Sequence, residues 1–451
     1  MPNALLNLTI RDKVKGGSML PLSLFSLYHF THGGQQILSS QSITINKNYI
    51  LLLIVVFGGF LVFGFSENIK GPALPRMQAD LSLDEMQIGL LLAFNSLGYL
   101  LACSFTGWLV RRAGMKFTTS LAFGSMALSG MFIYYAANYA ALSTAYFLMY
   151  VGNGILEIAL AILAARIFTK NTGTMMNLSH FFYGLSSTFA PIIAAALMGV
   201  NVFGPALGWR GMYMLMLTLT ILPMLPGLFA RYSGDEMKQE ERISLKDYAR
   251  DPVAWLIVAV LSFGVISELA VGGWLVNFLE KAYGWSSDAS AGMLSAFFFC
   301  FMLARLLLGP VTDKIGYTMS LIILSACSGL CSIAAIIVGE PGAFLFALAG
   351  VGIAPIYPTV MALLAKRYRS AADTAITFTV TLMGIASVIG NFLIGAITEW
   401  TKHLFAYGEL EEAGLIKGLQ AGYLFIGICA LLCSITSLLL YRMLRKRNEV
   451  L

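Results

Sequence analysis

Three acidic residues, Glu67, Glu157 and Glu268, stand inside long apolar stretches of the sequence. On insertion scales a charge at the centre of a membrane helix costs roughly 2.5–3.5 kcal/mol, so it is kept when it faces a polar cavity or a partner. Glu157 is the strongest candidate for chemistry, because the nearest base in its stretch, Arg166, lies about 13.5 Å away along a helix. An isolated buried acid can bind and release a proton. The alternative is a protonated glutamate with a purely structural hydrogen bond.

Lys70 follows Glu67 by three residues, so the two side chains can pair across one helical turn. The pair serves either proton coupling and substrate binding or simple neutralisation near the outer membrane face. Arg305 is expected to pair with Asp313 or with helix-end carbonyls at a cytoplasmic gate. Glu67, Glu157 and Glu268 are therefore the candidate proton-coupling groups.

Amides, phenols and rings accompany these charges inside the apolar stretches. His180 and Tyr183 share one helical face, as do Asn153 and Glu157. Such an inventory suits a sugar, whose C–H faces pack on aromatic rings and whose hydroxyls bond to amides and acids. Helix–helix hydrogen bonding and the interfacial aromatic belt are the alternatives. The candidate substrate-binding residues are Asn68, Asn95, Tyr99, Asn153, His180, Tyr183, Trp274, Asn277, Tyr357 and Asn391.

The stretches that carry these residues are long enough to be membrane helices. Hydrophobic residues make up 58% of the chain and charged residues 12%, about half the charge of a soluble domain. Runs of about 20 apolar residues indicate spanning helices rather than barrel strands. The sequence predicts an all-α membrane protein with spans at 48–69, 87–110, 117–136, 141–168, 174–199, 209–230, 253–279, 289–311, 317–338, 342–365, 373–398 and 417–441.

Basic residues alternate between the loops and predict the topology. Loops on one side carry most of the Lys and Arg, including Arg111, Arg112 and Arg367, and so should face the cytoplasm. Both termini then lie in the cytoplasm of a cell-membrane protein. The net charge of +6 needs no nucleic-acid partner, because this asymmetry explains it. Residues 1–46 are expected to form a poorly ordered cytoplasmic leader, with Met19 as an alternative start.

The chain divides into two six-helix halves. Residues 47–230 form the first half, 231–252 a polar cytoplasmic linker, 253–442 the second half and 443–451 a basic tail. An internal repeat supports the division: Gly107 and Gly114 flank a charged turn after the second span, and Gly309 and Gly316 flank another after the eighth. Parallel six-helix halves with a midplane site between them are a known transporter architecture.

The repeated turn resembles the cytoplasmic signature of the major facilitator superfamily. Arg111 replaces the family's first-half acid, which resembles the fucose permease branch, and Asp313 keeps the acid in the second half. Further segments are similar to that branch: Gly64–Pro75, Gly154–Glu157, Asn177–Gly184, Glu268–Trp274 and Ile356–Thr359.

The resemblance implies a secondary transporter that imports a hexose or related sugar with a proton by alternating access. It also implies gating or structural roles for Lys70, Arg111, Arg112, Arg305 and Asp313. One departure affects coupling, because the family's first-span aspartate falls at Gly71 and Glu67 stands one turn earlier. A proton-driven exporter of drugs or amphipaths and an organic-anion transporter remain alternatives on the same fold.

Other functional classes lack the residues they need. The chain has no phosphate-binding loop of the Gly-x-x-x-x-Gly-Lys-Ser/Thr type, and its six cysteines fall inside spans, where packing is their ordinary use. Only His180 among four histidines lies within a span, so neither an enzyme nor a metal site is expected. We expect a monomer in the lipid bilayer, with a small molecule and a proton as partners and no cofactor.

Overall fold

A computed structural model describes residues 47–449 of the chain, apart from 84, 202–205, 233–243 and 406–410. The predicted leader (residues 1–46) and half of the predicted linker therefore lie outside the described residues. Regular structure in the described part is helical, with one isolated bridge between Asn201 and Ala206. Twelve helical segments in it are long and apolar enough to cross a membrane, so the predicted all-α membrane fold is confirmed.

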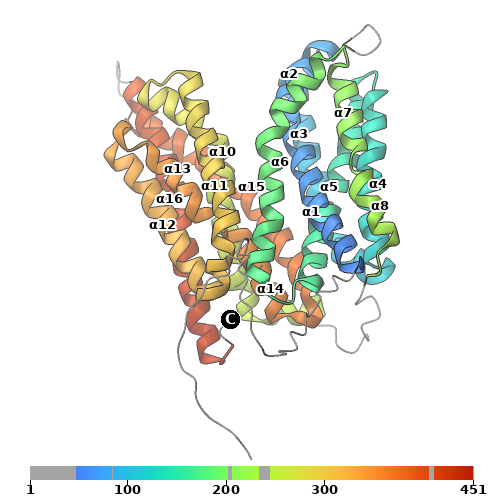
Figure 1. The fold of residues 1–451 in the computed structure, drawn as a ribbon. Helices are drawn as coiled ribbons and strands as arrows, with labels where there is room; N and C mark the ends of the chain where they lie inside the picture. The colour runs from blue at the N-terminus through green and yellow to red at the C-terminus, as the bar shows by residue number, and fades with distance from the viewer. Residues whose placement is uncertain (1–46, 84, 202–205, 233–243, 406–410, 450–451) are drawn as a thin grey trace, which may run out of the picture. The chain divides into compact units, whose positions relative to one another are not determined.

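The first half is built from eight helices in six spans (Figure 1). The first span continues from α1 into α2 with one residue, Ile69, between them, and the sixth divides into α7 and α8. Asn138 begins the fourth span by accepting a hydrogen bond from the Ala141 amide at 2.9 Å, as a helix N-cap does. The helices are α1 (Lys47–Asn68), α2 (Lys70–Leu81), α3 (Glu85–Ala113), α4 (Met115–Tyr134), α5 (Tyr139–Ile167), α6 (Thr172–Gly199), α7 (Gly208–Thr218) and α8 (Ile221–Phe229).

The second half repeats the six spans after the short linker helix α9. Its tenth span is broken into α13 and α14, which Ala354 and Pro355 separate. Short 3-10 turns at Glu340–Gly342 and Arg369–Ala371 precede the tenth and eleventh spans. The helices are α9 (Leu245–Arg250), α10 (Pro252–Tyr283), α11 (Ser287–Ile315), α12 (Tyr317–Val338), α13 (Phe344–Ile353), α14 (Ile356–Arg367), α15 (Ala372–Phe405) and α16 (Glu411–Lys446).

The repeated glycines have matching structural roles in the two halves. Gly114 and Gly316 are the single residues between consecutive helices, at φ 84° and φ 90°, a region that favours glycine. Gly107 and Gly309 lie where the halves touch: a Cβ on Gly107 would meet Thr377 of α15, and one on Gly309 would meet the backbone of Thr174 in α6. The sequence repeat therefore encodes two tight turns and two close inter-half approaches.

Two polar latches join the halves beside these turns. Asp313 accepts hydrogen bonds from the amides of Gly173 and Thr174 at 2.8 and 2.7 Å, at the N-terminus of α6, where a carboxylate is favoured. Arg111 donates to Thr374 at 3.1 Å and lies 4.0 Å from Asp373, in the first turn of α15. We call this end of the molecule, which bears Arg111, Arg112, Lys314 and Arg367, the basic end. Figure 1 shows α6 beside α11 in this region, and α3 packs on α15 in the same way.

We expect Asp313→Asn to loosen the basic end. An amide forms weaker bonds to the α6 amides than a carboxylate does, and a loss of roughly 1.4 kcal/mol would reduce the closed-to-open ratio about tenfold. The measurement is alkylation of a Thr377→Cys reporter by a water-soluble maleimide, with the six native cysteines replaced. Thr377 is buried between α3 and α15, so labelling reports opening. Asp373→Asn, which affects the longer 4.0 Å contact, is the control with a smaller expected effect. Equal labelling in parent and Asp313→Asn would contradict the latch.

A second cluster at the basic end joins three helix termini around Asp251. Its carboxylate accepts from the Val253 amide at 3.1 Å, Tyr368 at 2.9 Å, Arg367 at 3.2 Å and Arg447 at 3.0 Å. These contacts connect the start of α10 with the ends of α14 and α16. Partial burial raises the pKa of Asp251, but the donated hydrogen bonds outweigh it and hold the pKa below its ordinary value.

The Asp251 cluster predicts a stability difference that depends on pH. Because the folded-state pKa is lowered, the stabilisation is fully present above the unfolded value of about 3.9 and is lost as the pH falls through the folded value. Asp251→Asn should therefore lower the thermal unfolding midpoint at pH 7, and the difference from the parent should shrink below about pH 4. Asp247→Asn, an exposed acid paired with Arg250, is the control and should change little. A difference that stays constant down to pH 3 would refute the assignment.

Candidate functional site

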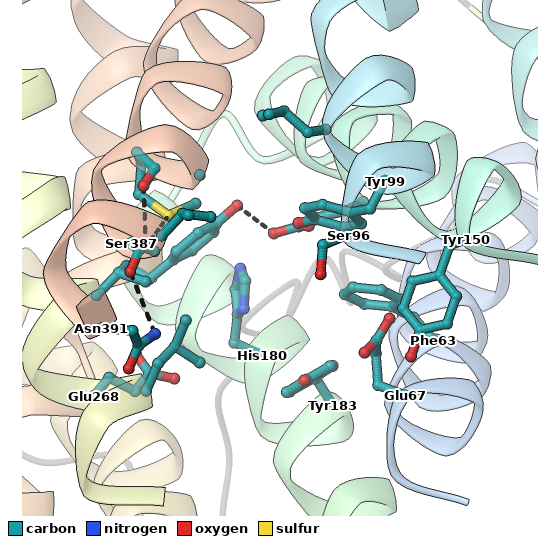
Figure 2. A pocket seen from close by; sticks show the side chains of 18 of the residues that line it. Phe63, Glu67, Ser96, Tyr99, Tyr150, His180, Tyr183, Glu268, Ser387 and Asn391 are labelled. Carbon is teal, nitrogen blue, oxygen red and sulfur yellow. Dashed lines mark hydrogen bonds between the residues drawn. The ribbon is translucent and has the colours of Figure 1, made fainter. Parts of the chain in front are cut away.

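A cavity of about 380 Å³ lies between the two halves (Figure 2). Its volume falls in the range of small-molecule sites. Its wall combines apolar and aromatic surface with acids, bases, hydroxyls and one amide. It is lined by Phe63, Glu67, Lys70, Ser96, Tyr99, Leu100, Tyr150, Glu157, His180 and Tyr183 from the first half, and by Val265, Glu268, Leu269, Arg305, Tyr357, Met383, Gly384, Ser387, Val388 and Asn391 from the second.

The cavity brings together most, but not all, of the residues singled out in the sequence. All three candidate proton-coupling acids lie in its wall, as do Lys70, Arg305 and five candidate substrate-binding residues: Tyr99, His180, Tyr183, Tyr357 and Asn391. Five other candidates are outside the wall: Asn68, Asn95, Asn153, Trp274 and Asn277. Arg111, Arg112 and Asp313 lie at the basic end, away from the cavity wall.

The candidates outside the wall have other surroundings. Asn68 donates to Ser187 at 2.9 Å and so bridges α1 and α6. Asn153 is bonded to Glu67, and Trp274 lies beside Gly395 of α15. Asn95 is buried, and neither atom of its amide has a hydrogen-bond partner within the described residues.

Glu157 is bonded by two tyrosines that come from different halves. It is 7% exposed on α5, the most buried of the spans. Tyr357 of α14 donates to Oε1 at 2.7 Å, and Tyr99 of α3 donates to Oε2. Gly154 allows the second contact, because a Cβ there would meet the carbonyl of Tyr99 at 2.6 Å. No cation pairs with Glu157 among the described residues. It can therefore exchange a proton without breaking an ion pair.

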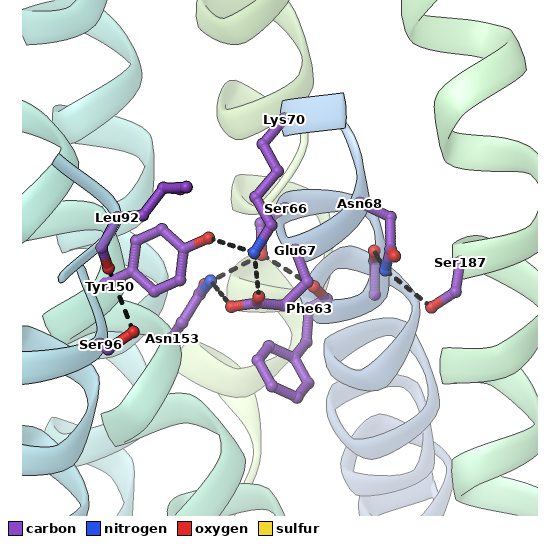
Figure 3. Close-up of polar contacts among 11 residues, drawn as sticks. Phe63, Ser66, Glu67, Asn68, Lys70, Leu92, Ser96, Tyr150, Asn153 and Ser187 are labelled. Atoms are coloured by element: carbon purple, nitrogen blue, oxygen red, sulfur yellow. Dashed lines mark hydrogen bonds and ion pairs between the residues drawn. The ribbon is translucent and has the colours of Figure 1, made fainter. Parts of the chain in front are cut away.

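Glu67 has a different environment, in which both of its oxygens are occupied (Figure 3). Lys70 lies 3.3 Å from Oε2, which confirms the predicted pair, and also donates to Tyr150 at 2.9 Å. Asn153 donates to Oε1 at 2.8 Å and in turn accepts from Ser66 at 2.9 Å. The bond from Asn153 thus goes to Glu67 rather than to its helix neighbour Glu157. Lys70 and Asn153 thus hold one oxygen of Glu67 each.

Arg305 lies in the cavity wall opposite Glu67, and its ion-pair partner differs from the expected one. It is 2% exposed, and its nearest acid is Glu268 at 3.3 Å rather than Asp313. A helix-end carbonyl is a second partner, but it lies inside the tenth span and not at a cytoplasmic gate as expected: Arg305 donates to Ala354 at 3.0 Å, at the break between α13 and α14. Pro358, four residues after Ala354, has no N–H to donate to that carbonyl. Arg305 therefore replaces a helix hydrogen bond that proline removes.

His180 lies at the junction of the two halves. Its ring centroid is 4.6 Å from Phe60 of α1 and 4.9 Å from Tyr357 of α14. Its carbonyl accepts from Arg305 at 3.4 Å. Figure 2 shows the imidazole projecting from α6 into the space between Glu268 on one side and Tyr99 on the other.

The fixed charges of the wall balance in pairs. Lys70 pairs with Glu67 and Arg305 with Glu268, which leaves Glu157 as the acid whose charge depends on a proton. With both pairs ionised and His180 uncharged, the wall carries no net charge when Glu157 is protonated and one negative charge when it is ionised. No cluster of three metal-ligating residues occurs among the residues that the structure describes.

Four polar or aromatic cavity residues were not singled out in the sequence: Phe63, Tyr150, Ser96 and Ser387. Helical spacing offered a signal for each of them. Tyr150 precedes Asn153 by three residues and Glu157 by seven, on one face of α5, and Ser387 precedes Asn391 by one turn. Ser96 precedes Tyr99 by three residues, and Phe63 precedes Glu67 by four.

Curated proteins offer distant relatives. The chain is 21% identical over 381 residues to a Protein TsgA homolog of Edwardsiella ictaluri; the matched region covers 82% of this chain and 92% of that protein. It is 22% identical over 247 residues to the alpha-ketoglutarate permease of Escherichia coli, which covers 52% of this chain and 53% of the permease.

Solved structures share the fold over nearly their whole length. The E. coli fucose:proton symporter FucP matches with a TM-score of 0.72 at 17% identity, over 87% of this chain and 99% of that one. The proton:xylose symporter XylE, bound to 6-bromo-6-deoxy-D-glucose, matches with a TM-score of 0.67 at 14% identity, over 86% and 94%. At these identities the likeness establishes the fold alone.

The sequence model of the Major Facilitator Superfamily matches residues 56–391. That range contains every residue of the cavity wall, from Phe63 to Asn391, and most of both halves. With twelve candidate membrane spans in the described chain, this match shows that the protein belongs to the Major Facilitator Superfamily of membrane transporters.

Proposed function

We propose that the protein is a proton-coupled secondary transporter that takes up a neutral sugar, such as a hexose, by alternating access. The observation that carries the proposal is the charge balance of the cavity. Both fixed cations of the wall are paired with acids, and Glu157 is held instead by two tyrosine hydroxyls. A proton on Glu157 makes the wall neutral, and a neutral substrate keeps it so.

The same balance argues against the organic-anion alternative. An anion brought into a water-poor site needs a cation that is free to pair with it, because unpaired charges there are costly. Lys70 and Arg305 would each have to leave a carboxylate, at 3.3 Å in both cases, to bind an anionic substrate. The partial relationship to a permease for alpha-ketoglutarate is therefore weaker support than the cavity itself.

The polar and aromatic surface of the cavity suits a sugar. Phe63 and Tyr183 offer rings from the first half, 5.2 Å apart between centroids, and Asn391 and Ser387 offer hydrogen-bonding groups from α15. Sugars present apolar C–H faces and several hydroxyls, and a cavity of about 380 Å³ is at the small end of ligand sites. The similarity in fold to fucose and xylose symporters is in keeping with this substrate class.

Orientation follows from the charged loops. On the positive-inside rule we assign the basic end to the cytoplasm. With an even number of spans, the start of α1 and the end of α16 belong to the same side. The latches of Asp313 and Arg111 close the cytoplasmic side of the cavity in this arrangement. We propose that the protein acts as a monomer in the cell membrane, with its substrate site facing outward.

The test uses the purified protein in liposomes with an imposed pH gradient, acid outside. Labelled neutral hexoses and 6-deoxyhexoses should accumulate above the external concentration, and collapse of the gradient should release them. A labelled dicarboxylate and a cationic dye are measured in the same liposomes. Gradient-driven accumulation of the dicarboxylate, or expulsion of the dye, with no movement of any neutral sugar would refute the proposal.

A further inference from the structure

The two hydrogen bonds to Glu157 are alike in chemistry but differ in the helices they connect. Tyr99 belongs to α3, which packs on α5 within the first half. Tyr357 belongs to α14 in the second half, so its 2.7 Å bond to Glu157 crosses between the halves. Glu157 thus accepts hydrogen bonds from two tyrosines, one from its own half and one from the other half.

We propose that Tyr357 is the residue that couples the proton to the movement of the halves: its hydroxyl tethers α14 to Glu157 while the acid is ionised and releases it on protonation. This inference rests on the proposed function. A hydrogen bond to a carboxylate is roughly twice as strong as one between neutral groups. The step places one proton on a carboxylate oxygen and breaks no covalent bond.

The position of Tyr357 lets a local change spread through the second half. It lies in the first turn of α14, directly after the break at Ala354 and Pro355. Arg305 holds the other side of that break through the carbonyl of Ala354 and also bonds the carbonyl of His180 in the first half. The start of α14 is thus held at two points. Glu157 of the first half bonds to Tyr357, and Arg305 bonds to Ala354 just before α14 and to His180 of the first half.

Few other titratable groups lie near Glu157. Tyr99 of α3 and Tyr357 of α14 bond to it directly. Cys103 of α3 donates to the carbonyl of Gly154, three residues before it, and His180 of α6 packs on Tyr357. Glu67 and Glu268 act on it from a greater distance, and each is bound to its own cation. Protonation of Glu157 can therefore change the Tyr357 bond without rearranging another ion pair.

The experiment compares Tyr357→Phe with Tyr99→Phe in liposomes. Each substitution removes one hydroxyl from Glu157 and keeps the ring. We measure counterflow exchange of labelled hexose, the accumulation ratio under a fixed pH gradient, and proton entry without sugar. Tyr357→Phe should retain measurable counterflow, lose most of the accumulation ratio and admit protons without sugar. Tyr99→Phe should slow transport as well, but the protons that enter should remain coupled to sugar.

Each outcome decides something. Full accumulation and no proton leak in Tyr357→Phe, or equal uncoupling by both variants, would overturn the role of Tyr357. Failure of the parent protein to move any neutral sugar with protons would instead overturn the proposed function, and this inference with it. If Tyr357→Phe does not fold, the pH dependence of Thr377→Cys labelling in the parent answers the same question. Labelling should rise at least fivefold on acidification and be fixed at the high level in Glu157→Gln; no pH dependence would refute the tether.

Discussion

Glu157→Gln is expected to reduce the accumulation ratio for sugar to one while leaving counterflow exchange within roughly threefold of the parent. An amide can occupy the space of the carboxylate and imitates its protonated form, in which Tyr357 is released, but it cannot bind and release a proton. A carrier that cannot take up the proton can still exchange one sugar molecule for another. Net uphill transport then has no energy source. This is the largest functional effect that the structure predicts.

Two controls make this result specific. Glu157→Asp keeps a titratable group one methylene further from the phenols and should retain part of the accumulation. Glu399→Gln removes an exposed acid paired with Lys402 and His403 at the end of α15, outside the cavity wall, and should behave like the parent. The measurement is uptake of labelled hexose into liposomes with and without a pH gradient. Unchanged uphill accumulation by Glu157→Gln would exclude the proton-carrier role.

Hydropathy predicted the spans well because the membrane imposes one length on all of them. Predicted and observed boundaries differ by a few residues for most spans. The helices of the eleventh and twelfth spans, α15 and α16, extend further, to Phe405 and Lys446. The breaks inside spans were not predicted, because a helix interrupted at Ala354 and Pro355 is as apolar as a continuous one. Pro355 and Pro358 were the available signal, since two prolines remove two helix hydrogen bonds.

The sequence identified the residues of the site more accurately than the contacts between them. Helical periodicity correctly placed Asn153 on the face of Glu157, but Asn153 bonds to Glu67 on another helix. Arg305 and Asp313 are eight residues apart, about 12 Å along a helix, so sequence proximity pointed to the wrong acid. The partner is Glu268, brought near by the packing of α10 on α11. Spacing within a helix can be read from sequence, whereas pairing between helices depends on how they pack.

The second large effect concerns the stability of the second half. Arg305→Ala should lower the free energy of unfolding by about 3–5 kcal/mol, the usual cost of removing one partner of a buried ion pair. Glu268 would lose its counter-ion, and the carbonyl of Ala354 would lose the donor that replaces the missing Pro358 N–H. The thermal unfolding midpoint in detergent measures the change. Arg250→Ala, which removes an exposed arginine paired with Asp247, is the matched control and should change it little.

A double-mutant cycle separates the two losses. Arg305→Met keeps an apolar side chain over the ring of Phe301, where the guanidinium now lies 4.1 Å from the centroid, but it removes every donor. Combining it with Glu268→Gln removes the unpaired carboxylate as well, so the double variant should be more stable than Arg305→Met alone. Recovery should stop short of the parent, because the Ala354 carbonyl still has no donor, at a cost of about 1–3 kcal/mol. If Arg305→Met and the double variant unfold at the same temperature, Glu268 gains nothing from Arg305, and the charge balance that supports a neutral substrate fails with it.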